Sequence, residues 1–164
     1  MQARGGITMA ISQRIEELGL HLPEPARPVA AYVPAVVHGG LCFTSGQLPF
    51  DQGRLLAEGM VGREVSLETA YAAARQAALN AVSAAALAVG GLDRLTGVVK
   101  VVGLVQSAPD FHQQPQVLNG ASELLQAVFG EAGRHARTAV GVSALPLNAA
   151  VEVECIFSWD AHGH

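Results

Sequence analysis

The 164-residue sequence predicts an α+β fold in which two main helices pack on one face of a mixed β-sheet. Three observations support this prediction. The apolar segments follow the order strand, strand, short strand, helix, strand, helix, strand, strand. The first long helical segment is rich in alanine, whose small side chain permits close packing on a sheet. The strand segment after it is rich in valine, which favours strands. We therefore expect a single layered domain.

The N-terminal third predicts a short helix, an extended connector and two strands. Residues 10–19, AISQRIEELG, have the apolar spacing of a short amphipathic helix, and the prolines of LPEPARP then disfavour helix. Residues 30–38 and 41–47 have the composition of two strands. Pro34 lacks a backbone N–H, which places the first strand at a sheet edge or a bulge. The FDQG stretch predicts a turn that leads into a short RLLAEG segment.

A long helix and a long strand are predicted in the middle of the chain. Ser66 is suited to cap a helix over residues 67–89, and Gly90 with Gly91 would end it. Residues 94–107, RLTGVVKVVGLVQS, predict a strand that is nearly continuous in valine and therefore covered on both faces. Because one layer of helices covers only one face, we expect oligomerisation to cover the other.

A second helix and two closing strands complete the predicted domain. The helix is expected over about residues 112–131. Strands are expected over about 137–144 and 150–158, and the LPLN stretch between them predicts a hairpin.

Three charges interrupt these closing strands. If Ala144 pairs with Ala149, Arg137 lies on the same face as Glu152 and Glu154, whereas a shift of one residue would separate them. From the pattern alone, an ordinary cross-strand ion pair on a solvated face is the commoner explanation. The alternative is a functional site, in which the guanidinium clamps a small carboxylate and a glutamate activates a water.

The composition argues against several classes of function. The net charge is −4 and the charges are scattered, so no basic stripe is available for nucleic acid. No uninterrupted apolar run reaches the ~20 residues of a membrane helix, and the start lacks a secretory apolar region, so we expect a cytoplasmic protein. Cys42 and Cys155 are expected as two buried thiols, although in a secreted protein they could pair. Only the HGH tail approaches a metal-ligand spacing, and we expect no metal.

Three stretches together resemble the YjgF/RidA family, in the same order along the chain. They are AAYVPAVVHGGLCFTSGQLPFD, LNGASELLQAVFG and HARTAVGVSALPLNAAVEVE. The resemblance covers about residues 28–158, which leaves residues 1–27 as an N-terminal extension with a short helix and 159–164 as a tail. It implies a chorismate-mutase-like fold and a homotrimer, with the sheets forming a central barrel and small-ligand clefts between subunits.

The resemblance also implies an activity without a metal or organic cofactor. Active members hydrolyse reactive enamines and imines, such as 2-aminoacrylate, to a 2-oxo acid and ammonia. Arg137 resembles the arginine that grips the substrate carboxylate, and Glu152 the acid that handles the catalytic water. The implied substrate-binding positions are Tyr32, Ser45, Gly46, Phe111 and Asn119. Because the clefts join two subunits, either Glu152 or Glu154 could face the cleft.

The sequence departs from the family pattern beside Arg137, where His135 replaces a proline and Ala139 a cysteine. The histidine could edge the cleft, although a surface position is commoner.

Two other functions therefore stay open: a non-catalytic trimer that binds a small carboxylate, and the RNA cleavage that some relatives are named for. The acidic balance argues against RNA cleavage.

Overall fold

The computed structural model describes residues 9–25 and 31–162. The elements are α1 (Ile11–Glu17), β1 (Ala35–His38), β2 (Leu41–Thr44), β3 (Phe50–Asp51), β4 (Arg54–Leu55), α2 (Leu67–Val89), η1 (Leu92–Arg94), β5 (Leu95–Gln106), α3 (Gln114–Phe129), η2 (Gly130–Gly133), β6 (Ala136–Val142), η3 (Pro146–Asn148) and β7 (Val151–Trp159). The order of helices and main strands agrees with the predicted order, but two short strands, β3 and β4, stand where one was expected.

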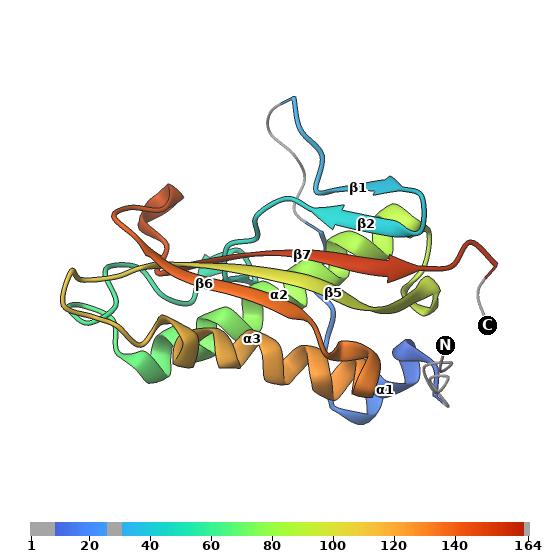
Figure 1. Cartoon of the computed structure of the whole chain (residues 1–164), viewed down its shortest axis with the longest axis horizontal. Coiled ribbons are helices and arrows are strands. Elements are labelled where there is room, and N and C mark those ends of the chain that lie inside the picture. Colours follow the sequence, from blue (N-terminus) through green and yellow to red (C-terminus); the bar gives the residue numbers. More distant parts are fainter. Residues whose placement is uncertain (1–8, 26–30, 163–164) are drawn as a thin grey trace.

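The main sheet has five strands in the order β1-β2-β7-β5-β6. Neighbouring strands are antiparallel except β5 and β6, which are parallel, so the sheet is mixed. The two main helices, α2 and α3, lie on the same face of it (Figure 1). The predicted α+β class is confirmed. The strands β3 and β4 form a small separate hairpin, in which Phe50 and Asp51 of the predicted FDQG turn belong to β3 and only Gln52 and Gly53 form the turn.

The predicted hairpin of the last two strands is wrong. Strand β5 lies between β6 and β7 and pairs with both, parallel to β6 and antiparallel to β7. The LPLN stretch is a short 3-10 turn rather than a hairpin loop. Helix α3 carries the chain from the end of β5 back to its beginning, so β6 starts beside β5 and runs in the same direction. This path places the most apolar strand inside the sheet, with a neighbour at each edge.

Local signals account for the bounds of α2. The Ser66 hydroxyl accepts a hydrogen bond from the Thr69 N–H at 3.1 Å, and Gly90 ends the helix in the left-handed region at φ 83°. Alanines dominate its buried face. Helix α3 crosses close to α2 at Gly120, where a Cβ atom would lie 2.9 Å from the carbonyl carbon of Tyr71. Small residues thus allow the two helices to share one apolar core.

Helix α2 is also the one described helix that is long and apolar enough to cross a membrane by length and composition. This is weak evidence for a membrane span, because the core helix of a globular domain passes the same test. The apolar 18-residue stretch of α2 is 61% buried inside the fold, against the sheet and α3. Its apolar character is therefore explained by packing within the domain.

The short helix α1 packs onto the domain through Ile11 and Ile15, which belong to the same apolar core. The boundary expected between residues 27 and 28 falls within 26–30, outside the described residues, as do 1–8 and 163–164 of the two ends. Trp159, expected as the first residue of the tail, is the last residue of β7, and its backbone N–H donates to the Gly40 carbonyl at 3.1 Å.

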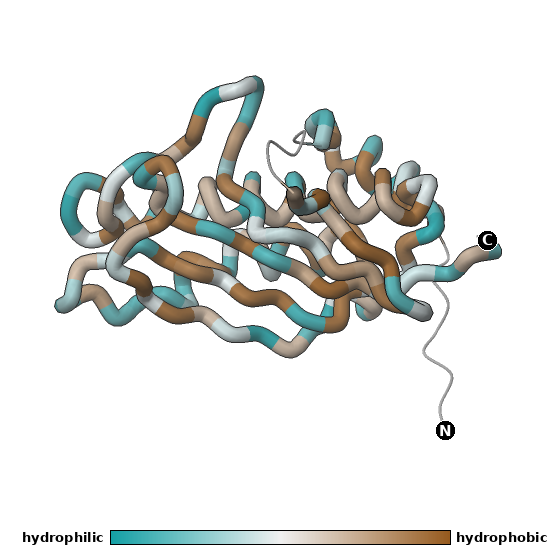
Figure 2. The backbone as a smooth tube through the Cα atoms, turned by 90° about the horizontal axis from the view of Figure 1, so that it is seen from above, coloured by the Kyte–Doolittle hydropathy of each residue, from teal (hydrophilic) through white to brown (hydrophobic). Residues whose placement is uncertain are grey.

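The face of the main sheet turned away from α2 and α3 is here called the open face. Its apolar side chains include Val36, Phe43 and Val140, which are 54%, 38% and 43% exposed. Figure 2 views this side of the molecule and shows apolar segments running along the strands. Strand β5 was expected to be covered on both faces, and one chain covers only the face against the helices.

Candidate functional site

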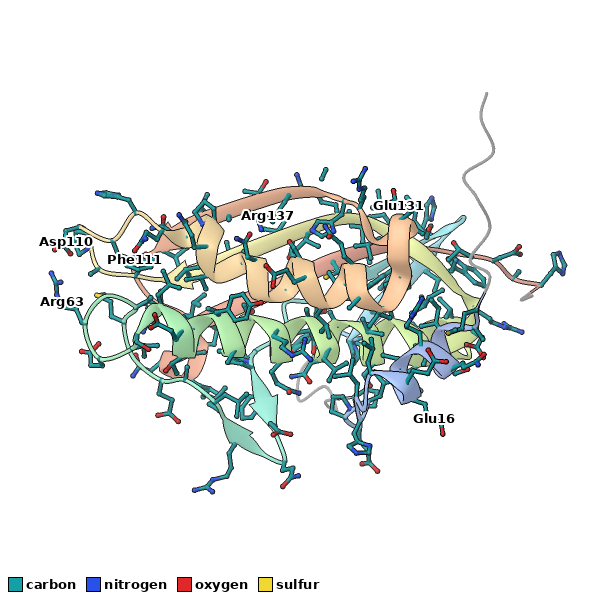
Figure 3. The ribbon with its side chains drawn as sticks, turned by 90° about the horizontal axis from the view of Figure 1, so that it is seen from below. Glu16, Arg63, Asp110, Phe111, Glu131 and Arg137 are labelled. Atoms are coloured by element: carbon teal, nitrogen blue, oxygen red, sulfur yellow. The ribbon has the colours of Figure 1, made fainter. Side chains whose placement is uncertain are left out.

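Arg137 lies on the helix-facing side of the edge strand β6. Its register partner on β5 is Val101, which in turn is opposite Cys155 on β7, and both partners are buried. The side chain therefore points toward α3, as Figure 3 shows. Its Nη1 group donates to Asn119 Oδ1 at 2.9 Å and to Ser122 Oγ at 3.2 Å. These two α3 residues are three apart, so they lie on one face of the helix.

The remaining donors of Arg137 are available to a ligand. A guanidinium has five N–H donors, and the two on Nη1 are taken by Asn119 and Ser122. Among the described residues, the arginines paired with a carboxylate are Arg14, Arg63 and Arg134, and Arg137 has no such partner. The charge of this half-buried guanidinium is not compensated by the two neutral oxygens that hold it, and its Nε–Nη2 edge matches both oxygens of a carboxylate.

The acids of β7 lie on the opposite face of the sheet from Arg137, so the predicted shared face is wrong. Glu154 is opposite Val102 and Glu152 is opposite Leu104 on β5, in rows that belong to the open face. Alternation along each strand was predicted correctly. The error came from pairing β6 with β7, since β5 between them sets a different register. No intrachain ion pair joins Arg137 to either acid within the described residues.

Glu152 is held in a half-buried position beside Gly46. The reciprocal backbone hydrogen bonds between Gln47 and Val153, at 2.8 and 3.0 Å, bring the segment after β2 against β7. A Cβ atom at Gly46 would lie 2.7 Å from Glu152 Cδ, so the carboxyl group occupies the space that the glycine leaves. Burial raises the pKa of Glu152, and the neighbouring Glu154 charge raises it further. Glu154 itself is exposed.

Ser45 and Tyr32 lie in the same region as Glu152. The Ser45 hydroxyl donates to the Val33 carbonyl at 2.7 Å, and its backbone N–H donates to the Pro34 carbonyl at 2.8 Å. These bonds tie the segment that carries Tyr32, which is 55% exposed, to the residues next to Gly46. Tyr32, Ser45, Gly46 and Glu152 are hereafter called the acid half-site.

Arg137 and Asn119, with Ser122, are hereafter called the arginine half-site. The structure thus divides the predicted residues into two groups, since Arg137 and Glu152 lie on opposite faces of the sheet. Phe111 belongs to neither group. It packs against Gly62 at the end of the molecule where Arg63 and Asp110 form an ion pair at 3.1 Å, away from Arg137 (Figure 3). Its predicted role stays a prediction.

Sequence reasoning missed Ser122, and for His135 it favoured a surface position over one at the edge of the cleft. The Ser122 hydroxyl lies 2.9 Å from His135 Nε2, and His135 Nδ1 lies 2.6 Å from the Gly133 carbonyl oxygen. The histidine is half-buried and linked through Ser122 to Arg137. The spacing Asn119-x-x-Ser122 in an otherwise apolar helix could have indicated the serine, because residues three apart share a helix face.

The described residues hold no group of three or more histidine, cysteine, aspartate or glutamate side chains placed to bind a metal. Cys42 and Cys155 are both free and buried, as predicted, and burial raises the pKa of both thiols. The polar groups of the two half-sites are a guanidinium, a carboxyl group and neutral hydrogen-bonding groups.

Residues 12–158 match a protein family described as "YjgF/chorismate mutase-like, putative endoribonuclease". The chain belongs to this family. It is 44% identical over 147 residues to protein TCP17 of Trypanosoma cruzi, covering 89% of this chain and 92% of that protein. This YjgF-family assignment agrees with the resemblance in the sequence.

Solved structures of relatives have the same fold. Atu1372 of Agrobacterium tumefaciens, whose function is unknown, is 43% identical, with a TM-score of 0.85 and 92% of each chain covered. RidA of an Antarctic Psychrobacter is 34% identical, with a TM-score of 0.56, and the match covers 82% of this chain and 93% of that one.

Proposed function

We propose that this YjgF-family protein is a cytoplasmic hydrolase that converts enamines and imines of 2-amino acids into 2-oxo acids and ammonia. The observation that carries the proposal is Arg137. It is a half-buried cation without a carboxylate partner in the described chain, and Asn119 and Ser122 hold it from one side. Such a group suits a small carboxylate ligand.

We propose further that the working site is formed between two subunits of a homotrimer whose open faces build a central barrel. The arginine and acid half-sites lie on opposite faces of one sheet, so a second copy of the chain is needed to bring Glu152 to a ligand on Arg137. The apolar residues of the open face support such an assembly, because a monomer would leave them in water.

The proposed chemistry needs no nucleophilic side chain. The Nε–Nη2 edge of Arg137 binds the carboxylate and fixes the reacting carbon near Glu152. An enamine takes a proton on carbon and becomes an imine, water adds to the C=N carbon, and ammonia leaves as the C=O bond forms. One water is consumed for each ammonia released. A glutamate with a raised pKa exchanges protons more readily near neutral pH than an ordinary one.

Release of ammonia and 2-oxo acid from imines made in situ by an amino-acid oxidase tests the proposal. Arg137→Lys and Glu152→Gln should each lower the acceleration by roughly a hundredfold or more. Lysine cannot bind both oxygens of the carboxylate with two parallel N–H donors, and glutamine cannot transfer a proton. Glu154→Gln is the matched control and should stay within a few-fold of the wild type. A folded, oligomeric wild type that accelerates no imine would overturn the proposal.

Binding without turnover is the second candidate, since the arginine half-site by itself explains only the capture of a carboxylate. It would appear in the same experiment as saturable binding of a 2-oxo acid without acceleration. The endoribonuclease part of the family description is not supported by the net charge of −4, because RNA binding depends on cationic side chains. RNA binding that falls steeply between low and moderate salt would support it.

A further inference from the structure

A chain of hydrogen bonds runs from the arginine half-site into the protein. Arg137 Nη1 donates to Ser122 Oγ, the Ser122 hydroxyl faces His135 Nε2 at 2.9 Å, and His135 Nδ1 faces the Gly133 carbonyl at 2.6 Å. The three side chains come from α3, from β6 and from the residue just before β6. Neither the family description nor the predicted site residues include Ser122 or His135.

The direction of each hydrogen bond follows from the chemistry of its partners. A backbone carbonyl can only accept, so His135 Nδ1 must carry the hydrogen. In the neutral ring Nε2 is then an acceptor, and the Ser122 hydroxyl must donate to it. The lone pairs of Ser122 Oγ are consequently left for Arg137 Nη1, which has no acceptor capacity of its own.

We infer that His135 is a positioning residue for the arginine half-site, in which Arg137 binds the carboxylate of the ligand. By accepting the Ser122 hydrogen, neutral His135 fixes the hydroxyl so that its oxygen faces the guanidinium. Hydrogen bonds in such a chain strengthen one another, so the serine becomes a better acceptor. Together with Asn119, it holds Nη1 and leaves the Nε–Nη2 edge presented to the ligand. The inference rests on the proposed function, because it assigns His135 to the carboxylate site.

Two substitutions separate this role from a merely structural one. Glutamine places its side-chain oxygen near the position of Nε2, so His135→Gln keeps the acceptor for Ser122 and loses the bond to Gly133. Asparagine places its amide nitrogen near the position of Nδ1, so His135→Asn keeps the bond to Gly133 and loses the acceptor. If His135 served only to anchor the chain at Gly133, the glutamine variant would be the more impaired.

The experiment is calorimetric titration of the oligomer with 2-oxobutanoate, for the wild type, Arg137→Lys, His135→Gln and His135→Asn. We expect His135→Gln to bind within about twofold of the wild type, and His135→Asn to bind roughly three- to tenfold more weakly, the range for one lost hydrogen bond. Adding Ser122→Ala to His135→Asn should cost little more than Ser122→Ala alone, because both act through one bond.

The outcomes are distinguishable. A folded wild type that does not bind 2-oxobutanoate overturns the proposed function, and this inference with it. Binding that is lost in Arg137→Lys but equal in both His135 variants overturns only the inference, as does the reversed order of the two variants. The tautomer of the His135 ring tests the inference without a ligand. Nitrogen NMR at about pH 8.5 should find the neutral His135 ring protonated on Nδ1, and protonation on Nε2 would overturn the inference.

Discussion

At the scale of single residues, Glu152 lies at a position that we propose to be functional, and its ionisation has a cost to stability. Half-burial and the Glu154 charge raise its pKa in the folded chain, so ionising it is less favourable in the folded than in the unfolded state. The stability linked to this group is therefore present at about pH 4, near the unfolded pKa, and is lost as the pH rises through the folded value. The function proposed for Glu152 would account for an acid at this position.

Glu152→Gln should accordingly gain stability relative to the wild type as the pH rises from about 4 to about 7, because glutamine does not ionise. Urea unfolding at both pH values, at one protomer concentration, measures the difference. Glu154→Gln serves as the comparison and should show a smaller pH-dependent gain, since Glu154 is exposed and is only the second cause of the shift. A gain for Glu152→Gln that is equal at both pH values would contradict this account.

At the scale of elements, α1 is capped by a residue from elsewhere in the chain. Ala10 at its N-cap offers no side-chain hydrogen bond. Asp93 of η1 takes over that role, with Oδ1 accepting from the Ser12 N–H and Oδ2 from the Ser12 hydroxyl, each at 2.8 Å. A cap supplied from far along the chain both stabilises the helix end and fixes α1 to the domain.

Asp93→Ala should cost about 1 kcal/mol and raise amide hydrogen exchange selectively in residues 11–17. Hydrogen exchange followed by mass spectrometry resolves this segment. Ser66→Ala removes the cap of α2, which is buried in the core, and should lower the global unfolding free energy by a similar amount without a selective effect on α1. Unchanged exchange of α1 in Asp93→Ala would show that Ile11 and Ile15 alone hold the helix.

At the scale of the whole molecule, the open face suits contact with other copies of the chain. Val140, Leu104 and Glu152 form one row across it, and Phe43 lies opposite Ile156 in another. The acids of β7 thus lie within an apolar surface. Assembly through this face would bury the apolar rows and complete the two half-sites at once.

Val140→Asp should weaken self-association at least tenfold and abolish activity together with it, because an unpaired charge would be buried in the interface. Sedimentation equilibrium gives the oligomeric state, and circular dichroism checks that the chain remains folded. Leu87→Asp, on the exposed side of α2, is the control and should leave both association and activity unchanged. A Val140→Asp variant that keeps the oligomeric state and the activity of the wild type would place the interface elsewhere.

The sequence by itself determined the type and order of the main helices and strands, and the bounds of α2, whereas β1 and β2 are shorter than predicted. Ser66 and Gly90 delimit α2 because caps act within a few residues, and alternation along β7 separates Val151, Val153 and Cys155 from Glu152 and Glu154 because side chains of a strand alternate. The motifs around Arg137 and Glu152 also indicated the YjgF family, which the comparisons confirm.

Only the tertiary structure decided which strands are neighbours and which faces meet. The insertion of β5 between β6 and β7 depends on the path of α3, which no local pattern contains, and it moved Glu152 to the opposite face from Arg137. The contacts of Arg137 with Asn119 and Ser122 join residues 18 and 15 positions apart across a helix–sheet interface. Short-range patterns report how a segment folds, whereas its partners are set by the packing of the whole chain.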